Sequence, residues 1–310
     1  MKKNILTALL MSLAVFVSAQ TEYDALRLSE TDIVGSARYM SMGGAFGSLG
    51  GDASALKDNP AGLGVFRSSE ISGTLNFSLN SLKPVEWYGK TTNQETYSKL
   101  NFNNFSYIVA GQTGNDEGLI SSNISFTYTK LKDYNKKFYM EGGASGSSFI
   151  DHLLEKSNGI PGAISYDNFD MPWLTVLGFD GYLLDTIPGT LNFYNYPNEG
   201  GTVNPTYLID QTGTLSELSF GWGGNYNNRL FIGANLNIRS LDYSLYSIYS
   251  EDFQLGGDFD IKNVLNQDGI GINAKLGLIY LPTNNLRVGF AFHTPSYMYI
   301  SEKGYADLNS

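Results

Sequence analysis

Hydrophobic and polar residues alternate along several stretches of the chain, and this alternation is the strongest structural signal in the sequence. Between 70 and 80, Leu75, Phe77 and Leu79 alternate with serine, threonine and asparagine. The same alternation recurs in the stretches 121–130, 218–226, 232–239, 270–278 and 286–293. A period of two over about ten residues is typical of a strand with one apolar face and one polar face. The sequence therefore predicts an all-β, antiparallel protein with about eight to ten strands.

The connections between these stretches suggest a particular kind of β-protein. Asn227-Asn228 and 282–285 are short, polar and turn-prone, whereas the connection expected over 142–215 is long. Short turns at one end and long loops at the other are typical of a transmembrane β-barrel. The polar faces carry serine, asparagine and glycine rather than lysine and glutamate, which suits an interior filled by other polypeptide. A soluble β-sandwich also alternates, so periodicity alone leaves that alternative open.

Residues 1–19 are expected to be a secretory signal peptide. Lys2 and Lys3 precede an apolar run, and Ala19 provides a small residue before the cleavage expected at Gln20. A membrane anchor is the weaker alternative, because a spanning helix needs about 20 apolar residues. No later stretch reaches that length. If the mature chain crosses a membrane, we expect it to do so with strands in 68–310, in the cell outer membrane of a Gram-negative bacterium.

Composition narrows the class further. The chain has 310 residues, with 35 glycines, 21 tyrosines and no cysteine, which excludes disulfides and thiolate metal sites. Only 16% of the residues are charged, and the mean hydropathy is −0.17. These values fit a membrane β-barrel, in which each strand needs only one apolar face. The net charge of −10 argues against a nucleic-acid partner.

A glycine-rich segment precedes the first expected strand. No strand comes before its glycines and no Gly-Lys-Ser/Thr follows them, which excludes a phosphate-binding loop. Asp52 is expected to cap a short helix that runs to Lys57, and Pro60 is expected to end it. The segment has too many small residues for a spanning strand. We expect 20–67 to fold as a plug inside the sheet.

Within this segment, Gly51-Asp52-Ala53-Ser54 and 59–63 resemble the N-terminal hatch of the long-chain fatty-acid outer-membrane transporters, the FadL/TodX family. The stretch 268–289 resembles paired strands of that family, and 303–309 continues the similarity. The sequence is most similar to a Bacteroidetes branch whose members are often labelled haemin receptors. The resemblance covers nearly the whole mature chain and is loose over 142–213. It marks the following hatch-motif residues: Gly51, Asp52, Asn59, Pro60, Ala61 and Gly62.

The resemblance implies a barrel of about fourteen strands around a luminal hatch at 20–67. Because a closed barrel leaves no edge exposed in lipid, we expect 68–310 to be an incomplete barrel and the chain to be truncated. The resemblance also implies passive uptake of hydrophobic compounds, above all long-chain fatty acids. We expect a monomer in outer-membrane lipids, with no cofactor. It further implies an opening in the barrel wall, for which the interruption at 131–135 is the candidate.

Large apolar residues in the long connection are the first candidate for substrate contact. The stretch 148–156 is expected to be a helix with one apolar face, and exposed loops seldom carry so many large apolar groups without a use. The expected capture groove consists of Phe149, Leu153, Met171, Trp173, Leu177 and Phe179. The alternative is that these residues pack a small core within the loop.

Cations on the inner faces of strands are the second candidate for substrate contact. The alternation places Arg239, Lys275 and Arg287 there, where they are suited to hold a fatty-acid carboxylate or a haem propionate. The favoured alternative is that they pair with acids of the hatch. The acids considered are Asp24, Glu30, Asp32, Asp52 and Asp58.

Enzymatic chemistry is not indicated by the sequence. There are two histidines, His152 and His293, no Gly-x-Ser-x-Gly stretch and no histidine pair at metal-binding spacing. We therefore predict neither a catalytic residue nor a metal site. Haem uptake remains an alternative function, although no histidine or tyrosine is singled out as an axial ligand. A barrel that serves secretion or attachment rather than transport is the other alternative.

Overall fold

The computed structural model describes residues 22–80, 82–94, 96–195, 201–254 and 256–310. It is mostly antiparallel β-sheet, with 56% of residues in strands and 14% in helices, as the alternation predicts. In this part of the chain no helix is long and apolar enough to cross a membrane. The expected signal peptide, residues 1–19, lies outside the described residues.

The N-terminal segment, residues 22–67, is built from short helices. They are α2 (Glu22–Ser29), α3 (Ala37–Ser41) and the 3₁₀ helices η1 (Ala53–Lys57) and η2 (Pro60–Val65). Asp52 caps η1 as expected, and its carboxylate accepts a hydrogen bond from the Ser54 N–H at 2.9 Å. Asn59 caps η2 in the same way, with its Oδ1 accepting from the Ala61 N–H at 3.0 Å. Two successive side-chain caps thus fold the glycine-rich stretch into tight turns.

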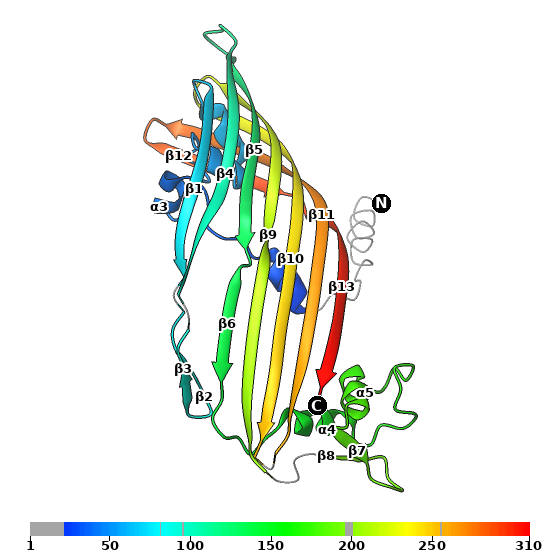
Figure 1. Ribbon diagram of the computed structural model, residues 1–310. Coiled ribbons are helices and arrows are strands. Elements are labelled where there is room, and N and C mark those ends of the chain that lie inside the picture. Colours follow the sequence, from blue (N-terminus) through cyan, green and yellow to red (C-terminus); the bar gives the residue numbers. More distant parts are fainter. Residues whose placement is uncertain (1–21, 81, 95, 196–200, 255) are drawn as a thin grey trace, which may run out of the picture.

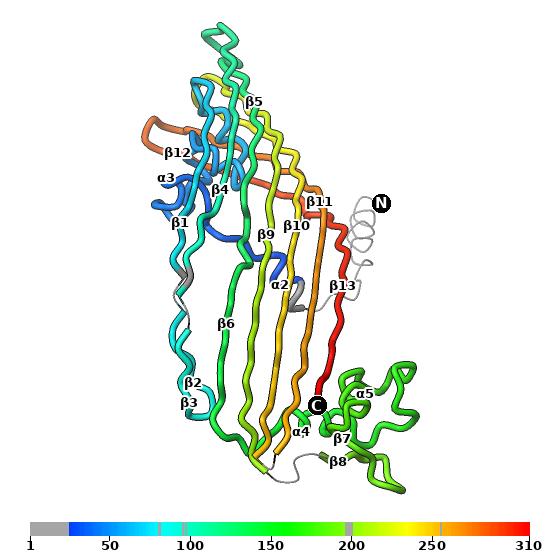
Figure 2. The backbone as a smooth tube through the Cα atoms, viewed as in Figure 1, coloured from blue at the N-terminus to red at the C-terminus, as the bar shows by residue number. Residues whose placement is uncertain are grey.

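One large sheet follows the N-terminal segment (Figure 1). Its strands are β1 (Glu70–Asn80), β4 (Tyr97–Gln112), β5 (Leu119–Asp133), β6 (Lys136–Glu141), β9 (Val203–Tyr226), β10 (Leu230–Phe253), β11 (Asp258–Thr283), β12 (Leu286–His293) and β13 (Tyr297–Asn309). The order is β1-β4-β5-β9-β10-β11-β12, with β6 also beside β9 and β13 beside β11. The N-terminal segment lies against one face, hereafter the inner face (Figure 2).

The turn between β9 and β10 and the interruption of β5 lie where the sequence predicts them. Asn227 and Asn228 have φ values of 54° and 53° and form the centre of the turn between β9 and β10, which the Arg229 N–H closes by donating to the Tyr226 oxygen at 3.0 Å. β5 ends at Asp133 and β6 begins at Lys136, so the strand is interrupted where 131–135 is expected to interrupt it. A register shift between Lys130 and Lys132 precedes this break.

The long connection is shorter than expected, because β9 already begins at Val203. The loop therefore covers 142–202 rather than 142–215. It contains α4 (Phe149–Ser157), α5 (Trp173–Asp180), β7 (Leu184–Thr186) and β8 (Phe193–Asn195), while β2 (Val85–Trp87) and β3 (Lys90–Thr92) lie between β1 and β4.

Three strands are much longer than the sequence predicts. β9, β10 and β11 have 24, 24 and 26 residues, more than twice the length of the alternating stretches in the sequence.

Candidate functional site

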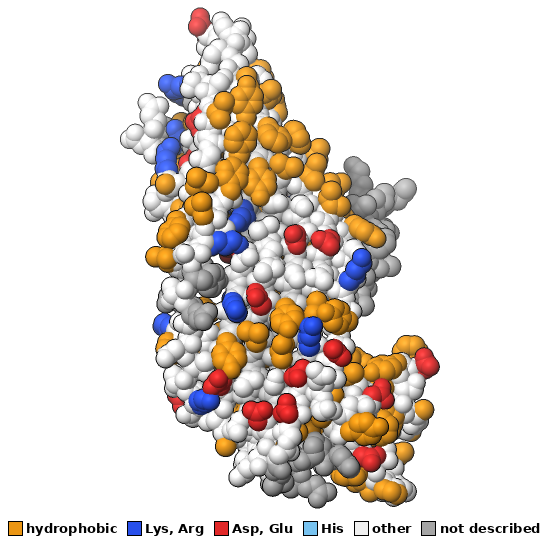
Figure 3. Space-filling view, viewed as in Figure 1, with side chains coloured by type: hydrophobic (Ala, Val, Ile, Leu, Met, Phe, Trp, Pro, Cys, Tyr) orange, Lys and Arg blue, Asp and Glu red, His pale blue; other side chains and the backbone are white. Residues whose placement is uncertain are grey.

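Near the short turns, the face of the sheet opposite the N-terminal segment, the outer face, is apolar. We call this surface the apolar belt, and its exposed residues include Leu218, Phe220, Trp222, Tyr226, Leu236, Ile270, Ile272, Leu276, Leu278 and Tyr280. Figure 3 shows hydrophobic side chains gathered over this end of the sheet. The inner face of the same strands is buried and polar, with Ser219, Asn235, Asn237 and Asn273. This is the reverse of a soluble protein, in which apolar side chains face the core.

The two faces exchange polarity about halfway along β9, β10 and β11. The exchange occurs at one row of cross-strand neighbours, Glu217, Arg239 and Gly271. Beyond this row the inner face becomes apolar, with buried Leu215, Leu241 and Tyr243. Next to this row the outer face is polar, with Thr214, Asp242 and Asp268 in register. Farther along, the outer face carries a second apolar patch that includes Leu208, Tyr246, Ile248 and Val264 (Figure 3). At this row, therefore, apolar side chains begin to cover the inner face, which is polar under the belt.

Two apolar clusters occupy the inner face beyond the exchange row. The near cluster contains Leu131, Tyr134, Leu215, Leu241 and Tyr243, with Leu245 and Leu265 packed against it. The far cluster joins the strands to the loop and contains Phe253, Phe259 and Ile261. Tyr134 and Tyr243 meet edge to face at 5.2 Å between ring centroids. Arg27 of α2 lies 3.9 Å from the centroid of the Tyr243 ring, so the N-terminal segment contacts the near cluster.

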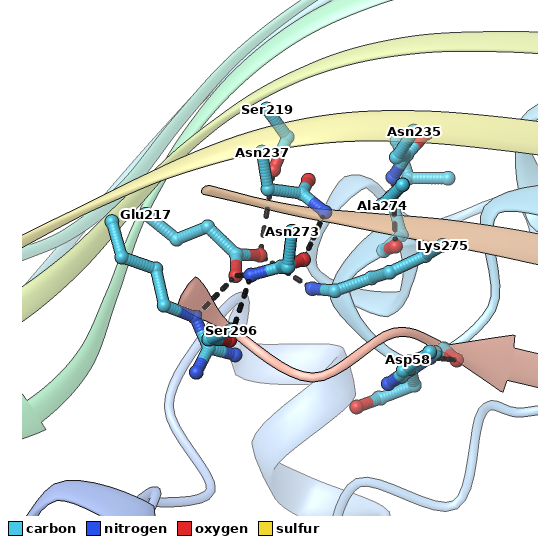
Figure 4. A network of polar contacts seen from close by, with 12 residues as sticks. Asp58, Glu217, Ser219, Asn235, Asn237, Asn273, Ala274, Lys275 and Ser296 are labelled. Carbon is cyan, nitrogen blue, oxygen red and sulfur yellow. Dashed lines mark hydrogen bonds and ion pairs between the residues drawn. The ribbon is translucent and has the colours of Figure 1, made fainter. Parts of the chain in front are cut away.

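A buried network of charges lies at the exchange row (Figure 4). The Glu217 side chain is 1% exposed and accepts hydrogen bonds from Lys275 Nζ at 2.5 Å and Arg239 Nε at 3.0 Å. Asn273 donates to Glu217 at 3.4 Å and accepts from Asn237 at 2.7 Å. The sequence predicts both cations but not Glu217. Glu217 could have been found from the alternation, because it lies two residues before Ser219 and therefore points to the same polar face of the strand.

None of the three predicted cations forms an ion pair with an acid of the N-terminal segment in the described residues. Arg239 and Lys275 bind Glu217 of the sheet, and Arg287 Nη1 donates to the backbone oxygen of Leu49 at 2.6 Å. Two of the acids do pair with a strand cation, but that cation is Lys132. Its Nζ lies 2.9 Å from Asp32 and 3.2 Å from Glu30. The side chain of Asp24 lies outside the described residues.

The stretch 59–64 packs against a row of glycines on the inner face. Gly223, Gly233 and Gly277 are direct cross-strand neighbours on β9, β10 and β11. A Cβ at Gly233 would overlap the carbonyl of Pro60, one at Gly277 would overlap Asn59 Oδ1, and one at Gly223 would lie 2.8 Å from backbone and side-chain atoms of 63–64. The row therefore allows two backbones to approach more closely than any side chain would permit.

Asparagine side chains hold the N-terminal segment to the strands around this row. Asn59 Nδ2 donates to the backbone oxygens of Gly47 at 2.7 Å and of Leu278 on β11 at 3.3 Å. From the sheet, Asn235 donates to the Leu56 oxygen at 3.0 Å, and Asn123 donates to the oxygens of Leu63 and Phe66 at 2.8 and 2.9 Å. Because backbone oxygens buried without a donor are costly, these contacts fix where the segment lies.

The six motif residues that the family resemblance marks lie in one compact unit. The Gly51 N–H donates to the Gly62 oxygen at 3.2 Å, which brings the two ends of the motif together. Asp52 also accepts from the Ser36 hydroxyl at 2.6 Å. Asn59, Pro60 and Ala61 are the residues pressed against the glycine row. The motif thus makes the contact between the segment and the sheet.

Asp58 is a partly buried carboxylate beside the motif. The Tyr39 hydroxyl donates to its Oδ2 at 2.6 Å, and His293 Nε2 lies 2.9 Å from its backbone oxygen. Burial raises the pKa of Asp58 above the ordinary aspartate value of 3.8, although Tyr39, Lys57 and Lys275 oppose this effect. Burial also lowers the pKa of Lys57. The N-terminal segment therefore contains a charge that folding disfavours.

This raised pKa predicts a defined pH dependence of stability. Between its unfolded and folded pKa values, Asp58 binds more protons in the folded state, so the free energy of unfolding falls as pH rises from about 4. Asp58→Asn keeps an oxygen for Tyr39 and removes the titration. We expect the stability of the native protein relative to Asp58→Asn to decline with rising pH, as measured by urea unfolding between pH 4 and 8. The exposed Asp116→Asn is the control, and a difference that does not vary with pH would contradict this assignment.

The loop between β6 and β9 forms a small core of its own. Ser148 caps α4 with the reciprocal Asp151 contact, and the buried Glu251 of β10 accepts from Ser148 Oγ and the Phe149 N–H at 2.5 and 2.6 Å. The loop core contains the expected capture residues Leu153 and Met171, whereas Phe149, Leu177 and Phe179 are half-buried. Trp173 is 51% exposed. Loop packing therefore explains part of the predicted set, and Trp173 is the member most available to a ligand.

Cavities meet where β5 is interrupted. In the described part of the chain, 97–102 of β4 pairs with β1 alone, while β6 pairs with β9. Three cavities of about 520, 480 and 220 Å³ lie here, and Asn135 lines all three. Lys99 lines the first and third of them. The predicted interruption at 131–135 thus coincides with a hollow in the sheet between β4 and β6.

Comparison with known proteins adds no family assignment. No protein-family model matches the sequence, and no curated protein matches it significantly. The resemblance to fatty-acid transporters therefore stays a prediction from the motif residues.

Proposed function

We propose that the protein is an outer-membrane transporter for the passive uptake of hydrophobic compounds, with long-chain fatty acids as the substrate class. The observation that carries this proposal is the exchange of polarity along β9, β10 and β11. One half of each strand has the surface of a protein that faces lipid. In the other half the buried apolar clusters lie on the inner surface, and the outer surface next to the exchange row is polar.

The apolar belt supports a position in the bilayer. In β9 it runs from Leu218 to Tyr226, which corresponds to about 30 Å of strand at roughly 3.3 Å per residue. A transmembrane β-barrel has an apolar outer band about 25 Å tall, and its strands are tilted. In this proposal the sheet forms part of a barrel wall, and residues 22–67 form its luminal hatch. The strand halves beyond the exchange row then project outside the membrane.

The inner apolar clusters support a path for substrate. A hydrophobic compound that meets Trp173 and the loop would move along the inner face toward Leu245 and Tyr243, away from water. The charged network at Glu217 and the docked stretch 59–64 then block its passage through the belt region. The cavities around Asn135, which lie beyond the exchange row beside Gly213, give a route sideways through the sheet. This arrangement fits delivery of an apolar substrate better than conduction of ions.

Oleate binding to the detergent-folded protein tests this function. We expect saturable binding of a fluorescent oleate analogue, and Leu245→Asn, on the inner face, should weaken it about tenfold, which corresponds to about 1.4 kcal/mol. Ile248→Asn is the matched control, because Ile248 is also half-buried but lies on the outer face of the same strand. Absence of saturable binding, or equal weakening by both substitutions, would contradict the proposal.

A further inference from the structure

The apolar belt contains a groove on the outer face of β9, β10 and β11. Its volume is about 610 Å³. Ala234 and Ala274 are small outward-facing residues, and larger neighbours surround them in register. Trp222 and Leu276 flank Ala234, and Leu236 is directly opposite Ala274. The groove thus arises because two alanines interrupt a surface of large apolar side chains.

The walls of the groove are held in place by contacts within the sheet. Trp222 Nε1 donates to Ser122 Oγ of β5 at 3.0 Å, which holds the indole ring toward β5 at the edge of the groove. Phe126 and Phe220 pack against each other with ring centroids 5.3 Å apart. Bulky aromatic groups fixed in this way keep a groove open, as in preformed ligand sites, whose volumes are roughly 300–1,000 Å³.

We infer that this groove binds one acyl chain of a membrane lipid. The inference rests on the proposed function, since insertion in a bilayer is what brings hydrocarbon to the belt. Belt residues surround the groove, so a bound molecule meets apolar side chains and the bilayer but no water. The polar residues that adjoin it, Ser125, Asn235 and Lys275, are buried and contribute to the inner face. The outer surface therefore suits hydrocarbon rather than a head group.

The groove lies directly behind the glycine row. Ala234 follows Gly233 in β10, and Leu276 precedes Gly277 in β11, so the two features occupy opposite faces of the same strand positions. Small residues on both faces make the sheet thin at this point. An acyl chain in the groove restores packing on the outer face where 59–64 packs on the inner face.

Native mass spectrometry of the detergent-purified full chain tests the inference, with palmitoyl-oleoyl-phosphatidylethanolamine as the probe. The native protein is expected to retain about one lipid after detergent exchange, whereas Ala234→Leu/Ala274→Leu, which fills the groove, should reduce occupancy at least tenfold. Ala274→Leu alone is a milder variant and should give an intermediate loss. Val288→Leu adds a methylene elsewhere on the belt and should retain the lipid. No retention by the native protein, or equal retention by the filled variant, would overturn the inference.

A second measurement separates this inference from the proposed function. Among the three tryptophans, Trp222 is the one on the belt, so Trp87→Phe/Trp173→Phe leaves a single reporter. In vesicles of phosphatidylcholine brominated on its acyl chains, Trp222 fluorescence should be quenched. Absence of quenching would contradict the membrane position and with it the proposed function. Quenching combined with equal lipid retention by the native and filled proteins would overturn the groove inference alone.

Discussion

Replacing Gly233 by alanine is expected to loosen the N-terminal segment from the sheet. The new Cβ would overlap the backbone carbonyl of Pro60, which cannot rotate away as a side chain could. Either strand β10 or the stretch 59–64 must shift, and such overpacking destabilises by about 1–3 kcal/mol. Displacement would also weaken the hydrogen bonds of Asn59. Trypsin cleavage after Lys57 in the folded protein should therefore become about 5- to 150-fold faster, since each 1.4 kcal/mol changes the open population tenfold.

Gly73→Ala provides the control for this experiment. Gly73 also lies within a strand, but a Cβ there would have its nearest neighbours at 3.8 Å, an ordinary contact. Its cleavage rate should match that of the native protein. If Gly233→Ala were cleaved at the native rate as well, the close approach at the glycine row would not be what holds the segment.

Removing the carboxylate of Glu217 is expected to have the larger effect on global stability. In Glu217→Met, Lys275 loses its ion-pair partner while its side chain is only 3% exposed. An uncompensated buried charge of this kind destabilises a protein by about 3–5 kcal/mol. Arg239 loses the same partner but is 20% exposed, so water can solvate it in part. Urea unfolding followed by tryptophan fluorescence would measure the difference.

The double variant Glu217→Met/Lys275→Met tests the cause of this effect. Replacing both partners by apolar side chains removes the unpaired charge, so most of the lost stability should return. The exposed pair of Lys90 and Glu141 gives the comparison, because Glu141→Met should leave stability nearly unchanged. A single variant as stable as the native protein, or a double variant no more stable than the single one, would contradict a structural role for the network.

The sequence predicts those parts of the strands in which the apolar residues stay on one face. It misses the parts of β9, β10 and β11 in which the apolar residues change to the other face. In β10 the apolar residues lie at even positions from Ile232 to Ile238, whereas Leu241, Tyr243 and Leu245 lie at odd positions. The change of phase conceals a single long strand, because a window that spans it shows no consistent alternation. β9 changes phase at the same row, which is why 203–215 is expected to be loop but belongs to the sheet.

Some residues of the candidate site can likewise be predicted from the sequence, whereas their contacts cannot. Their positions in the alternating pattern are enough to place Arg239 and Lys275 on the inner face, since successive side chains along a strand point to opposite faces. These positions do not identify their partner. Glu217 and Lys275 are 58 residues apart in the chain, and they meet because the register of three strands brings them together. Likewise, the loop residues are recognisable as apolar, but only packing separates the buried Leu153 from the exposed Trp173.

What the sequence by itself determines is local. The period-two stretches, the Asn227-Asn228 turn, the break at 131–135 and the caps at Asp52 and Ser148 all depend on neighbours a few residues away. These neighbours satisfy backbone hydrogen bonds without help from the rest of the chain. The glycine row, the buried carboxylate and the groove depend instead on strand register. Register is set by pairing between distant segments, and a shift of one residue would turn every side chain to the opposite face, so only the tertiary structure decides them.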